Sequence, residues 1–300
     1  MTAQVALRRT GTRVDLGELV VPVVQGPAPL LVVSDFDGTL SPMNPDPLGA
    51  RILPLARTAL RRLARLSALR PERVRLVVLS GRTATDVAAR VRVGGVRYMG
   101  NHGLEGGWLG RGARAEALEV AVDEAVAASI EPADALGRAV AARLREPEWL
   151  FVEEKGPSVA FHYRMAADPV AARAALDAAI ESVLADEASA TEGLLDRIDG
   201  RKVVEFRPAG AGGKGASLDR LLERERPGTV LILGDDRADA EAFEALRRHR
   251  AAGRTKGLIV GVHGAAETPA EVVAGADVVV AEPAEAARLL SAVARQLEQE

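Results

Sequence analysis

The pattern of apolar positions predicts three buried strands whose carboxyl ends all carry polar side chains. Short, mostly apolar runs occupy positions 30–33, 74–79 and 229–233. They lead into Asp35, Ser80 and Asp235 respectively. In a parallel sheet the carboxyl ends of the strands lie side by side, at the edge where such folds bind ligands. The three polar positions are therefore expected to share one site.

Segments with helical spacing separate these runs. Leucine, alanine and arginine recur at helical intervals over residues 47–68, and a second such segment covers about 83–92. The glycine-rich stretch 212–215 opens a third segment at 216–226, which would place Lys214 near a helix amino end suited to anions. This alternation predicts an α/β fold with a doubly wound parallel sheet, a Rossmann-like core.

The alternation is interrupted in the middle of the chain. Long helices rich in alanine, arginine and glutamate replace it there, with strand-like runs at 159–163 and 203–206. The pattern predicts an inserted α+β cap domain that covers the site and opens and closes on glycine- and proline-rich hinges. The expected boundaries are an amino-terminal extension at 1–27, a discontinuous core at 28–104 and 208–300, and a cap at 105–207.

Composition is that of an ordinary enzyme. With 300 residues the chain exceeds the usual size of a single core, which agrees with two domains. The formal net charge of −3 gives no electrostatic reason to expect nucleic acid or an acidic membrane as a partner. The chain has no cysteine, which excludes disulfides and thiolate metal sites. No apolar stretch reaches the ~18 residues of a transmembrane helix and the amino end lacks a secretory apolar region, so the cytoplasm is the expected location.

The strongest chemical signal is the pair Asp35 and Asp37, followed by Gly38. Residues i and i+2 of an extended chain face the same side, so both carboxylates can line one pocket. Asp35 can then attack phosphorus while Asp37 protonates the departing oxygen. An EF-hand is excluded, because Leu40 stands where that loop needs glycine and Asp46 where it needs glutamate. A surface turn rich in aspartate and glycine is the remaining alternative.

The other polar positions each have a simple structural alternative. Ser80 and Gly81 also suit a plain strand-to-helix turn. Asp235, together with Asp236 and Asp239, also suits the acidic first turn of a helix. Lys214 does not belong to a phosphate-binding Walker loop, because Gly215 follows it where serine or threonine is required.

Taken together, these four motifs resemble those of haloacid dehalogenase-like phosphohydrolases. A carboxylate nucleophile is repelled by a phosphate dianion, so a divalent cation is expected, and carboxylate oxygens are the hard ligands that Mg²⁺ prefers. The resemblance implies that Ser80 binds a phosphoryl oxygen and that Lys214 balances charge on the nucleophile. It also implies a Mg²⁺ site that involves Asp35, the backbone carbonyl of Asp37, Asp235, Asp236 and Asp239.

Several longer strings narrow the resemblance to trehalose-6-phosphate phosphatases. They lie at 101–105, 152–156, 162–164, 202–208 and 234–243. This likeness implies that Glu153, Lys155 and Glu205 bind sugar hydroxyls. The full set of implied substrate-binding residues is Arg82, Asn101, His102, Glu153, Lys155, Lys202 and Glu205.

These residues also have structural alternatives. Glu153 and Lys155 also fit a solvated strand edge, and His102 a structural hydrogen-bonding role. The chain departs from the family pattern at Ala238, where many relatives carry threonine.

The implied activity is Mg²⁺-dependent hydrolysis of trehalose 6-phosphate to trehalose and phosphate through an aspartyl-phosphate. Three alternatives share the same core motifs. One is a phosphatase for another sugar phosphate, such as glucosylglycerol phosphate or mannosyl-3-phosphoglycerate. Another is a phosphomutase, which would release no phosphate. The third is a catalytically silent sugar-phosphate binder or regulatory subunit. The sequence leaves the oligomeric state open.

Overall fold

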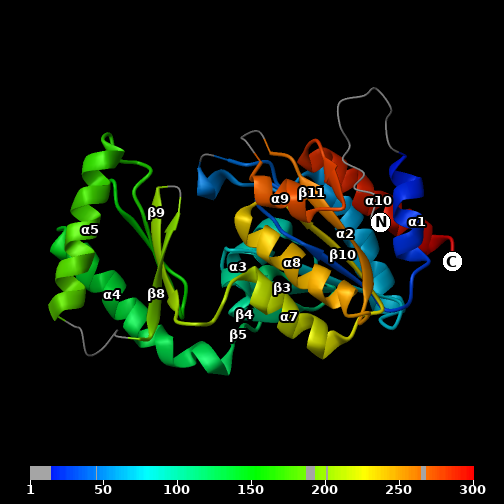
Figure 1. The fold of residues 1–300 in the computed structure, drawn as a ribbon, viewed down its shortest axis with the longest axis horizontal. Helices are drawn as coiled ribbons and strands as arrows, with labels where there is room; N and C mark the ends of the chain where they lie inside the picture. Colours follow the sequence, from blue (N-terminus) through cyan, green and yellow to red (C-terminus); the bar gives the residue numbers. More distant parts are fainter. Residues whose placement is uncertain (1–14, 45, 187–192, 201, 265–267) are drawn as a thin grey trace. The chain divides into compact units, whose positions relative to one another are not determined.

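The chain folds into two compact units in a computed structural model that describes residues 15–44, 46–186, 193–200, 202–264 and 268–300 (Figure 1). The core unit comprises residues Met1–Ala121 and Gly213–Glu300, and the inserted unit comprises Val122–Gly212. Each is a body with its own hydrophobic core.

The core unit is built on one eight-stranded sheet with the order β12-β11-β10-β1-β2-β3-β4-β5. Five neighbouring pairs from β12 to β3 are parallel, and β4 runs antiparallel to β3 at one side. The strands are β1 (Leu30–Ser34), β2 (Val74–Leu79), β3 (Val96–Gly100), β4 (Glu105–Leu109), β5 (Ala121–Val122), β10 (Thr229–Gly234), β11 (Lys256–Val262) and β12 (Val278–Val280). All five residues of β1 are buried, as expected for a central parallel strand covered on both faces.

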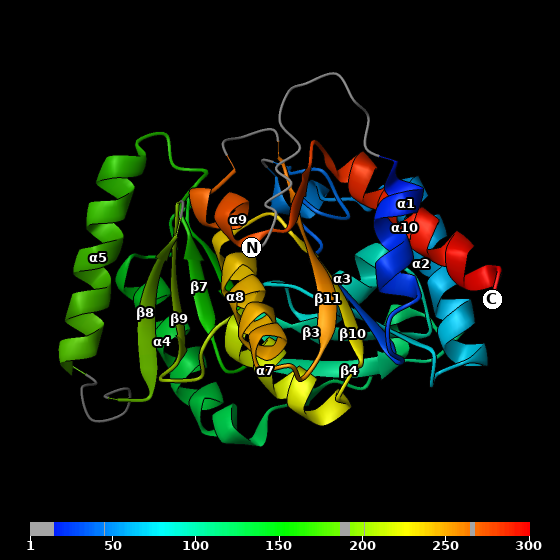
Figure 2. The same cartoon turned by 45° about the vertical axis from the view of Figure 1, so that its right-hand side comes forward.

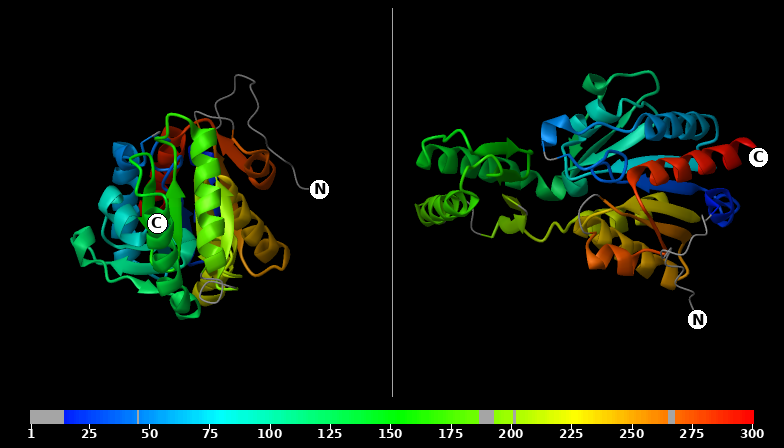
Figure 3. Two further views of the ribbon diagram at one scale, coloured as in Figure 1. Left: turned by 90° about the vertical axis from the view of Figure 1, so that its left-hand side faces the viewer. Right: turned by 90° about the horizontal axis from the view of Figure 1, so that it is seen from above.

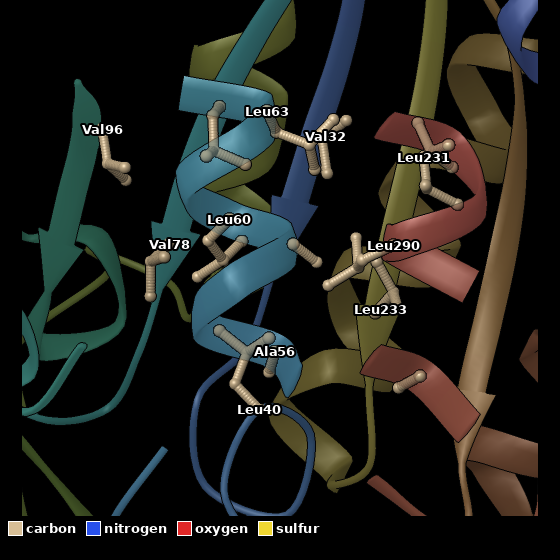
Figure 4. Packing of buried hydrophobic residues seen from close by; sticks show 14 of the residues in the cluster. Val32, Leu40, Ala56, Leu60, Leu63, Val78, Val96, Leu231, Leu233 and Leu290 are labelled. Atoms are coloured by element: carbon tan, nitrogen blue, oxygen red, sulfur yellow. The ribbon is translucent and has the colours of Figure 1, made fainter. Parts of the chain in front are cut away.

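Helices cover both faces of this sheet (Figures 2 and 3). On one face, side chains of four helices pack with Val32, Val78 and Leu231 of the central strands. These helices are α1 (Leu16–Val24), α2 (Pro54–Leu69), α3 (Ala84–Val91) and α10 (Pro283–Glu298). Figure 4 shows Leu60 and Leu63 of α2 on this face.

The opposite face carries a second layer, in which Val33 and Ile232 pack against Leu218 and Phe243. Its helices are α7 (Lys214–Glu225), α8 (Arg237–Ala251) and α9 (Ala270–Gly275). The doubly wound parallel sheet predicted from the sequence is therefore confirmed.

The amino-terminal extension falls partly outside the described residues, which begin at position 15. Asp15 caps α1 by accepting a hydrogen bond from the backbone of Gly17 at 2.7 Å. Val20, Val23 and Val24 of this helix are buried in the same cluster as α2 and α10. The described part of the extension is thus packed onto the core.

The inserted unit contains a four-stranded antiparallel sheet with the order β6-β7-β9-β8. Its elements are η4 (Glu124–Ser129), α4 (Ile130–Arg143), β6 (Phe151–Glu154), β7 (Val159–His162), α5 (Pro169–Asp186), β8 (Leu195–Gly200) and β9 (Val203–Pro208). Alternate residues of the strands, such as Phe161 and Val204, pack with Leu136 of α4 and Leu176 of α5. The other face of the sheet carries the polar side chains of Glu153, His162 and Glu205 together with apolar residues such as Phe151 and Ile198.

The compact unit begins at residue 122, whereas the sequence predicted an insertion at 105–207. The difference at its start has a simple cause, because residues 105–109 form β4 and pair with β3 of the core sheet. Three short 3₁₀ turns complete the core unit: η1 (Pro47–Gly49), η2 (Asn101–Gly103) and η3 (Ala115–Ala117).

Within the part of the chain that the structure describes, every helix is too short or too polar to cross a membrane.

Candidate active site

The strand register of the core sheet brings the predicted polar positions to one edge. Ser34 at the end of β1 is paired with Leu233 of β10 on one side and with Val78 of β2 on the other. Asp35 therefore emerges between the ends of β10 and β2. Its backbone amide donates to the carbonyl oxygen of Leu233 at 3.0 Å, which fixes where the carboxylate begins.

Lys214 joins two of the carboxylates at this edge. Its Nζ atom donates to Oδ1 of Asp35 at 2.6 Å and to Oδ1 of Asp239 at 2.8 Å. Lys214 is the first residue of α7 and is 1% exposed. Burial alone would lower the pKa of Lys214, but the negative charges of Asp239 and Asp35 outweigh this effect and raise it well above its usual value. The ammonium group is therefore a fixed positive charge inside the acidic cluster.

Asp239 is held by the start of α8. Its Oδ2 accepts hydrogen bonds from the backbone amides of Asp235 at 2.9 Å and Asp236 at 3.2 Å, and Asp236 caps the helix in return through its own carboxylate. This acidic group therefore has both of the features predicted from the sequence. It caps the start of α8, and it places Asp235 and Asp239 beside Asp35. The side chain of Asp236 is engaged in the cap and is solvent-exposed.

Asp235 is positioned by the turn that follows β1. Thr39, which is fully buried, donates from its hydroxyl to Oδ1 of Asp235 at 3.2 Å. Gly38 has a φ of +83°, and a Cβ atom there would lie 2.0 Å from Oδ2 of Asp235. Glycine is required at this position both for its backbone conformation and for the close approach of the carboxylate.

The three buried carboxylates carry more negative charge than Lys214 compensates. Burial is the largest cause that raises the pKa of Asp35 to about 8, with Lys214 acting against it and Asp235 adding to it. Burial, followed by the charge of Asp239, likewise raises the pKa of Asp235 to about 8. The folded protein thus favours the protonated forms of Asp35 and Asp235 unless another cation binds beside them.

This cluster fits a divalent metal ion. One ligand oxygen from each of Asp35, Asp235 and Asp239 lies within 4.8 Å of the others, and all three residues are buried. The buried Oδ2 atom of Asp35 has no hydrogen-bond partner among the described residues. An unsatisfied buried carboxylate oxygen, excess negative charge and all-oxygen donors are together what a hard cation such as Mg²⁺ requires.

The loops after β2 and β3 bring the remaining core residues to the same edge. The backbone amide of His102 donates to the carbonyl oxygen of Ser80 at 2.9 Å, and that of Asn101 donates to the carbonyl oxygen of Arg82 at 2.7 Å. Asn101 and His102 both have left-handed backbone conformations, with φ of 51° and 57°. Ser80 is buried, and its Oγ accepts from the backbone amide of Arg82 at 3.2 Å. Ser80, Arg82, Asn101 and His102 are therefore linked into one structure.

Asp37 is directed differently from Asp35. Its carboxylate accepts two hydrogen bonds from Arg82, Nε to Oδ2 at 2.6 Å and Nη2 to Oδ1 at 2.8 Å. Its side chain is 34% exposed, compared with 6% for Asp35. Asp37 is thus partly solvated, whereas Asp35 is buried.

A second polar cluster lies in the inserted unit, on the face of its sheet opposite the helices. Lys155 pairs with Glu205 at 2.6 Å, and Arg207 pairs with the same glutamate. His162 lies 2.9 Å from Glu153 through its Nε2 atom. Burial would raise the pKa of Glu153, but the hydrogen bond with His162 and the charge of Lys155 hold it below its usual value.

Strand register explains this cluster, because Glu153, Ala160 and Glu205 are successive partners across β6, β7 and β9. Glu153, Lys155 and Glu205 are thus brought together within this unit. Lys202 lies in the turn before β9 with its side chain exposed, and the described contacts do not include it in the cluster.

Several residues at the core edge were not identified from the sequence. Thr39 directly follows the aspartate–glycine motif, and its buried hydroxyl contacts Asp235. Glu105 accepts a hydrogen bond from the backbone amide of Ala84 at the start of α3, at 2.6 Å. Asp86, in the first turn of α3, contacts Arg82 at 3.0 Å. The i,i+4 spacing of Arg82, Asp86 and Arg90 was a sequence signal for the second contact, whereas the contact of Glu105 with α3 has no such spacing.

Comparison with solved structures defines the class of fold. The C-terminal domain of trehalose-6-phosphate phosphatase from Candida albicans superposes with a TM-score of 0.67 at 20% identity, covering 93% of this chain and 96% of that one. A haloacid dehalogenase-like hydrolase from Bacteroides thetaiotaomicron superposes with a TM-score of 0.54 at 17% identity, covering 90% and 98% of the two chains. The chain has the fold of haloacid dehalogenase-like hydrolases that carry a cap domain.

The sequence comparisons define the family within this class. The model of the trehalose-phosphatase family matches residues 33–272, and the chain belongs to that family. A trehalose-phosphate phosphatase of Mycobacterium avium is 36% identical over 221 residues, which are 72% of this chain and 51% of the relative. One of Mycobacterium tuberculosis is 34% identical over 227 residues, 73% and 51% of the two chains. The chain spans about half the length of these curated relatives.

Proposed function

We propose that this chain is a Mg²⁺-dependent phosphatase that hydrolyses trehalose 6-phosphate to trehalose and inorganic phosphate. The observation that carries the proposal is the buried contact of Lys214 with Asp35 beside Asp235 and Asp239, in a chain of the trehalose-phosphatase family. Phosphoryl transfer requires little beyond a positioned nucleophile and charge neutralisation, and this cluster supplies both.

In the first half of the reaction, the carboxylate of Asp35 attacks the phosphorus atom and the bond from phosphorus to the sugar oxygen breaks. Lys214 holds Oδ1 of Asp35 at 2.6 Å and fixes the direction of the carboxylate. Asp37 gives a proton to the departing sugar oxygen, because an alkoxide is a poor leaving group. Ser80 and Asn101 stand at the same edge, where their polar groups can bind phosphoryl oxygens.

In the second half, water cleaves the aspartyl-phosphate. Asp37, now ionised, takes a proton from the attacking water, and the carboxylate of Asp35 is regenerated as phosphate leaves. Its partial exposure lets the side chain reach water. A bound Mg²⁺, held by Asp35, Asp235 and the carbonyl of Asp37 with Asp236 and Asp239 in support, would neutralise the phosphate charge that opposes attack.

The sugar is proposed to be recognised by the polar cluster of the inserted unit. Glu153, Lys155 and Glu205 offer two acceptors and a donor at fixed spacing, which suits a neutral polyol. Their pairing is consistent with a preformed site, because Lys155 forms an ion pair with Glu205 and Glu153 is hydrogen-bonded to His162 before a ligand binds. Lys202, exposed in the turn before β9, is proposed to contribute from the periphery.

The decisive experiment is phosphate release from trehalose 6-phosphate, compared with glucose 6-phosphate, glucosylglycerol phosphate and mannosyl-3-phosphoglycerate, with Mg²⁺ and with a chelator. We expect Mg²⁺-dependent release that is fastest from trehalose 6-phosphate. Preference for another member of the panel would reassign the substrate. Isomerised sugar phosphate without free phosphate would indicate a phosphomutase, and binding without turnover would indicate a silent regulator.

Two substitutions separate the roles of the aspartate pair. Asp35→Asn removes the nucleophile and should abolish turnover. Asp37→Asn should leave a slow residual rate, lower by about 10²–10⁴-fold, because only proton transfer is lost. Normal phosphate release by Asp35→Asn would refute the nucleophile assignment.

The sugar subsite has a matched control in β6, the strand that carries Glu153. Glu205→Gln and Lys155→Met should raise KM for trehalose 6-phosphate while leaving hydrolysis of p-nitrophenyl phosphate, which has no sugar, close to the parent rate. Glu154 is adjacent to Glu153 but points to the other face of β6. Glu154→Gln should therefore change neither the KM for trehalose 6-phosphate nor the hydrolysis of p-nitrophenyl phosphate. An equal loss on both substrates would remove these residues from sugar recognition.

A further inference from the structure

Arg82 fixes the orientation of Asp37 in the core unit. Two guanidinium nitrogens bind the two carboxylate oxygens of Asp37, at 2.6 and 2.8 Å. A bidentate pair of this kind restricts rotation of the carboxylate as well as its position. Asp37 follows the end of β1 on a turn and is half-exposed, so this pairing supplies much of what fixes its side chain.

Arg82 is itself held from two further directions. Its third nitrogen, Nη1, donates to Oδ2 of Asp86 at 3.0 Å. Its guanidinium carbon lies 5.7 Å from the centre of the Phe36 ring, within the range of a cation–π contact. Only 14% of the Arg82 side chain is exposed. The guanidinium plane that orients Asp37 is thus set by its neighbours.

Asp86 connects this pair to the rest of the core unit. The same Oδ2 atom accepts from Nε of Arg90 at 2.8 Å, one turn later in α3. Arg90 in turn donates through Nη1 to the backbone carbonyl oxygens of Leu48 at 3.1 Å and Ala50 at 2.9 Å. A continuous chain of charged contacts therefore runs from the segment after β1, through α3, to Asp37.

We propose that Asp86 is a positioning residue for the proton-transferring Asp37, acting through Arg82. The inference rests on the proposed function, because it presumes that Asp37 moves a proton to the sugar oxygen. Proton transfer depends steeply on geometry, and a displacement of about 1 Å can cost on the order of 100-fold in rate. Without Asp86, the guanidinium of Arg82 keeps its contact with Asp37 but loses one of the contacts that hold its plane.

The leaving group distinguishes this role from phosphate binding. A sugar alkoxide needs a proton as the bond to phosphorus breaks, whereas p-nitrophenolate is stable without one. Cleavage of the aspartyl-phosphate also uses Asp37 but is common to both substrates, so the comparison is made on kcat/KM, which reports the steps up to departure of the leaving group. On kcat/KM, a residue that acts through Asp37 should matter for the sugar phosphate and much less for the aryl phosphate. A residue that binds the phosphoryl group should affect both substrates equally.

The experiment compares Asp86→Asn with the parent on trehalose 6-phosphate and on p-nitrophenyl phosphate at saturating Mg²⁺. We expect kcat/KM for the sugar phosphate to fall by about 10-fold and kcat/KM for the aryl phosphate to stay within about twofold. Asp37→Asn should show a larger loss on the sugar phosphate, again with little loss on the aryl phosphate. The double variant should be no slower than Asp37→Asn alone, because both changes act on one group.

Asp177→Asn is the matched control. Asp177, in α5 of the inserted unit, also pairs with two arginines, Arg173 and Arg197, one of them four positions away in the same helix. Its loss removes a doubly paired aspartate remote from Asp37 in sequence, and both activities should stay at the parent level. Arg90→Gln provides a second test, because it frees Asp86 from its other side and should give a smaller loss with the same selectivity.

Equal losses by Asp86→Asn on both substrates, or a double variant slower than Asp37→Asn, would overturn the inference. The proposed function fails separately, and the inference with it, if trehalose 6-phosphate is not hydrolysed or if Asp37→Asn shows no selectivity between the two leaving groups. Selectivity in Asp37→Asn without selectivity in Asp86→Asn would overturn the inference alone.

Discussion

The ammonium group of Lys214 lies 2.6 Å from the carboxylate of Asp35, although the two residues stand 179 positions apart in the sequence. The contact joins the first residue of α7 to the residue that follows β1. Both side chains are almost fully buried, at 1% and 6% exposure. A charge buried this deeply is tolerated only when it is paired, so Lys214 and Asp35 each stabilise the buried charge of the other.

Replacing Lys214 by methionine should therefore destabilise the protein strongly. The substitution keeps the apolar stem but leaves Asp35 and Asp239 buried without their cation. Removal of one partner from a buried pair typically costs about 3–5 kcal/mol. Denaturant unfolding with a chelator present would measure this loss as the difference in free energy of unfolding between the parent and the variant.

Lys256→Met at the exposed start of β11 is the control and should change the free energy of unfolding by no more than about 0.5 kcal/mol. Equal stabilities for the two variants would mean that the Lys214 pair contributes nothing to the fold.

The stability of the metal-free protein should fall as pH rises from about 4 to about 8. The pKa of Asp35 is near 3.8 when unfolded and is raised to about 8 in the folded protein, chiefly by burial. A raised pKa means that the folded state binds the proton more tightly, so its contribution to stability is present at low pH and is lost as pH increases through this window. The slope is at most about 1.4 kcal/mol per pH unit for each proton.

Asp35→Asn removes one of the groups responsible and should flatten this dependence. The measurement is the free energy of unfolding at pH 5 and pH 8 in the presence of a chelator, for the parent and the variant. Asp46→Asn, at an exposed position after β1, should retain the parent slope. A parent protein that is more stable at pH 8 than at pH 5 would contradict the raised pKa.

The convergence of Asp35, Ser80, Lys214 and Asp235 was predictable because it depends on strong, local signals. Apolar runs identify buried strands, and parallel pairing then brings their carboxyl ends to one edge. Ser34 of β1 is paired with Leu233 of β10 and with Val78 of β2, so the carboxyl ends of these three strands lie side by side, as the sequence pattern predicted. The glycine-rich stretch before Lys214 likewise marked the start of a helix, and α7 begins at that residue.

Other features were not predictable because they depend on contacts between elements. β4 contains Gly106 and Gly107 and lacks apolar alternation, so its place in the core sheet comes only from pairing with β3. The hydrogen bonds of Asp37 to Arg82, and of Thr39 to Asp235, reflect a choice of rotamer that no spacing encodes. The sequence predicted the candidate reactive residues, and the structure adds the groups that contact them.

Gly38→Ala should impair metal binding more than it impairs folding. The new Cβ atom would lie 2.0 Å from Oδ2 of Asp235, so the carboxylate must move. Isothermal titration with Mg²⁺ should show weaker binding by about 10-fold or more, as for changes that disturb a ligand's support. Turnover should fall in parallel.

Gly112→Ala separates the clash from backbone strain. Gly112 has a similar φ of +74°, but a Cβ atom there meets nothing within 4 Å. Both variants should lose about 1 kcal/mol from the left-handed conformation, and only Gly38→Ala should lose metal affinity. Unchanged Mg²⁺ binding by Gly38→Ala would show that Asp235 is not a ligand in the position described.

Binding of Mg²⁺ should release protons, and its apparent affinity should increase with pH up to about 8. The pKa values of Asp35 and Asp235 are both raised to about 8, chiefly by burial, so below that pH a metal ion must displace protons from them. The stabilisation by Mg²⁺, seen as a rise in Tm, should accordingly be larger at pH 8 than at pH 5.

Calorimetric titration in two buffers with different ionisation enthalpies counts the protons released. Asp235→Asn should release fewer protons than the parent, since it keeps one less titrating ligand. If the parent bound Mg²⁺ with no proton release at pH 6, the three buried carboxylates could not be the group that holds the ion.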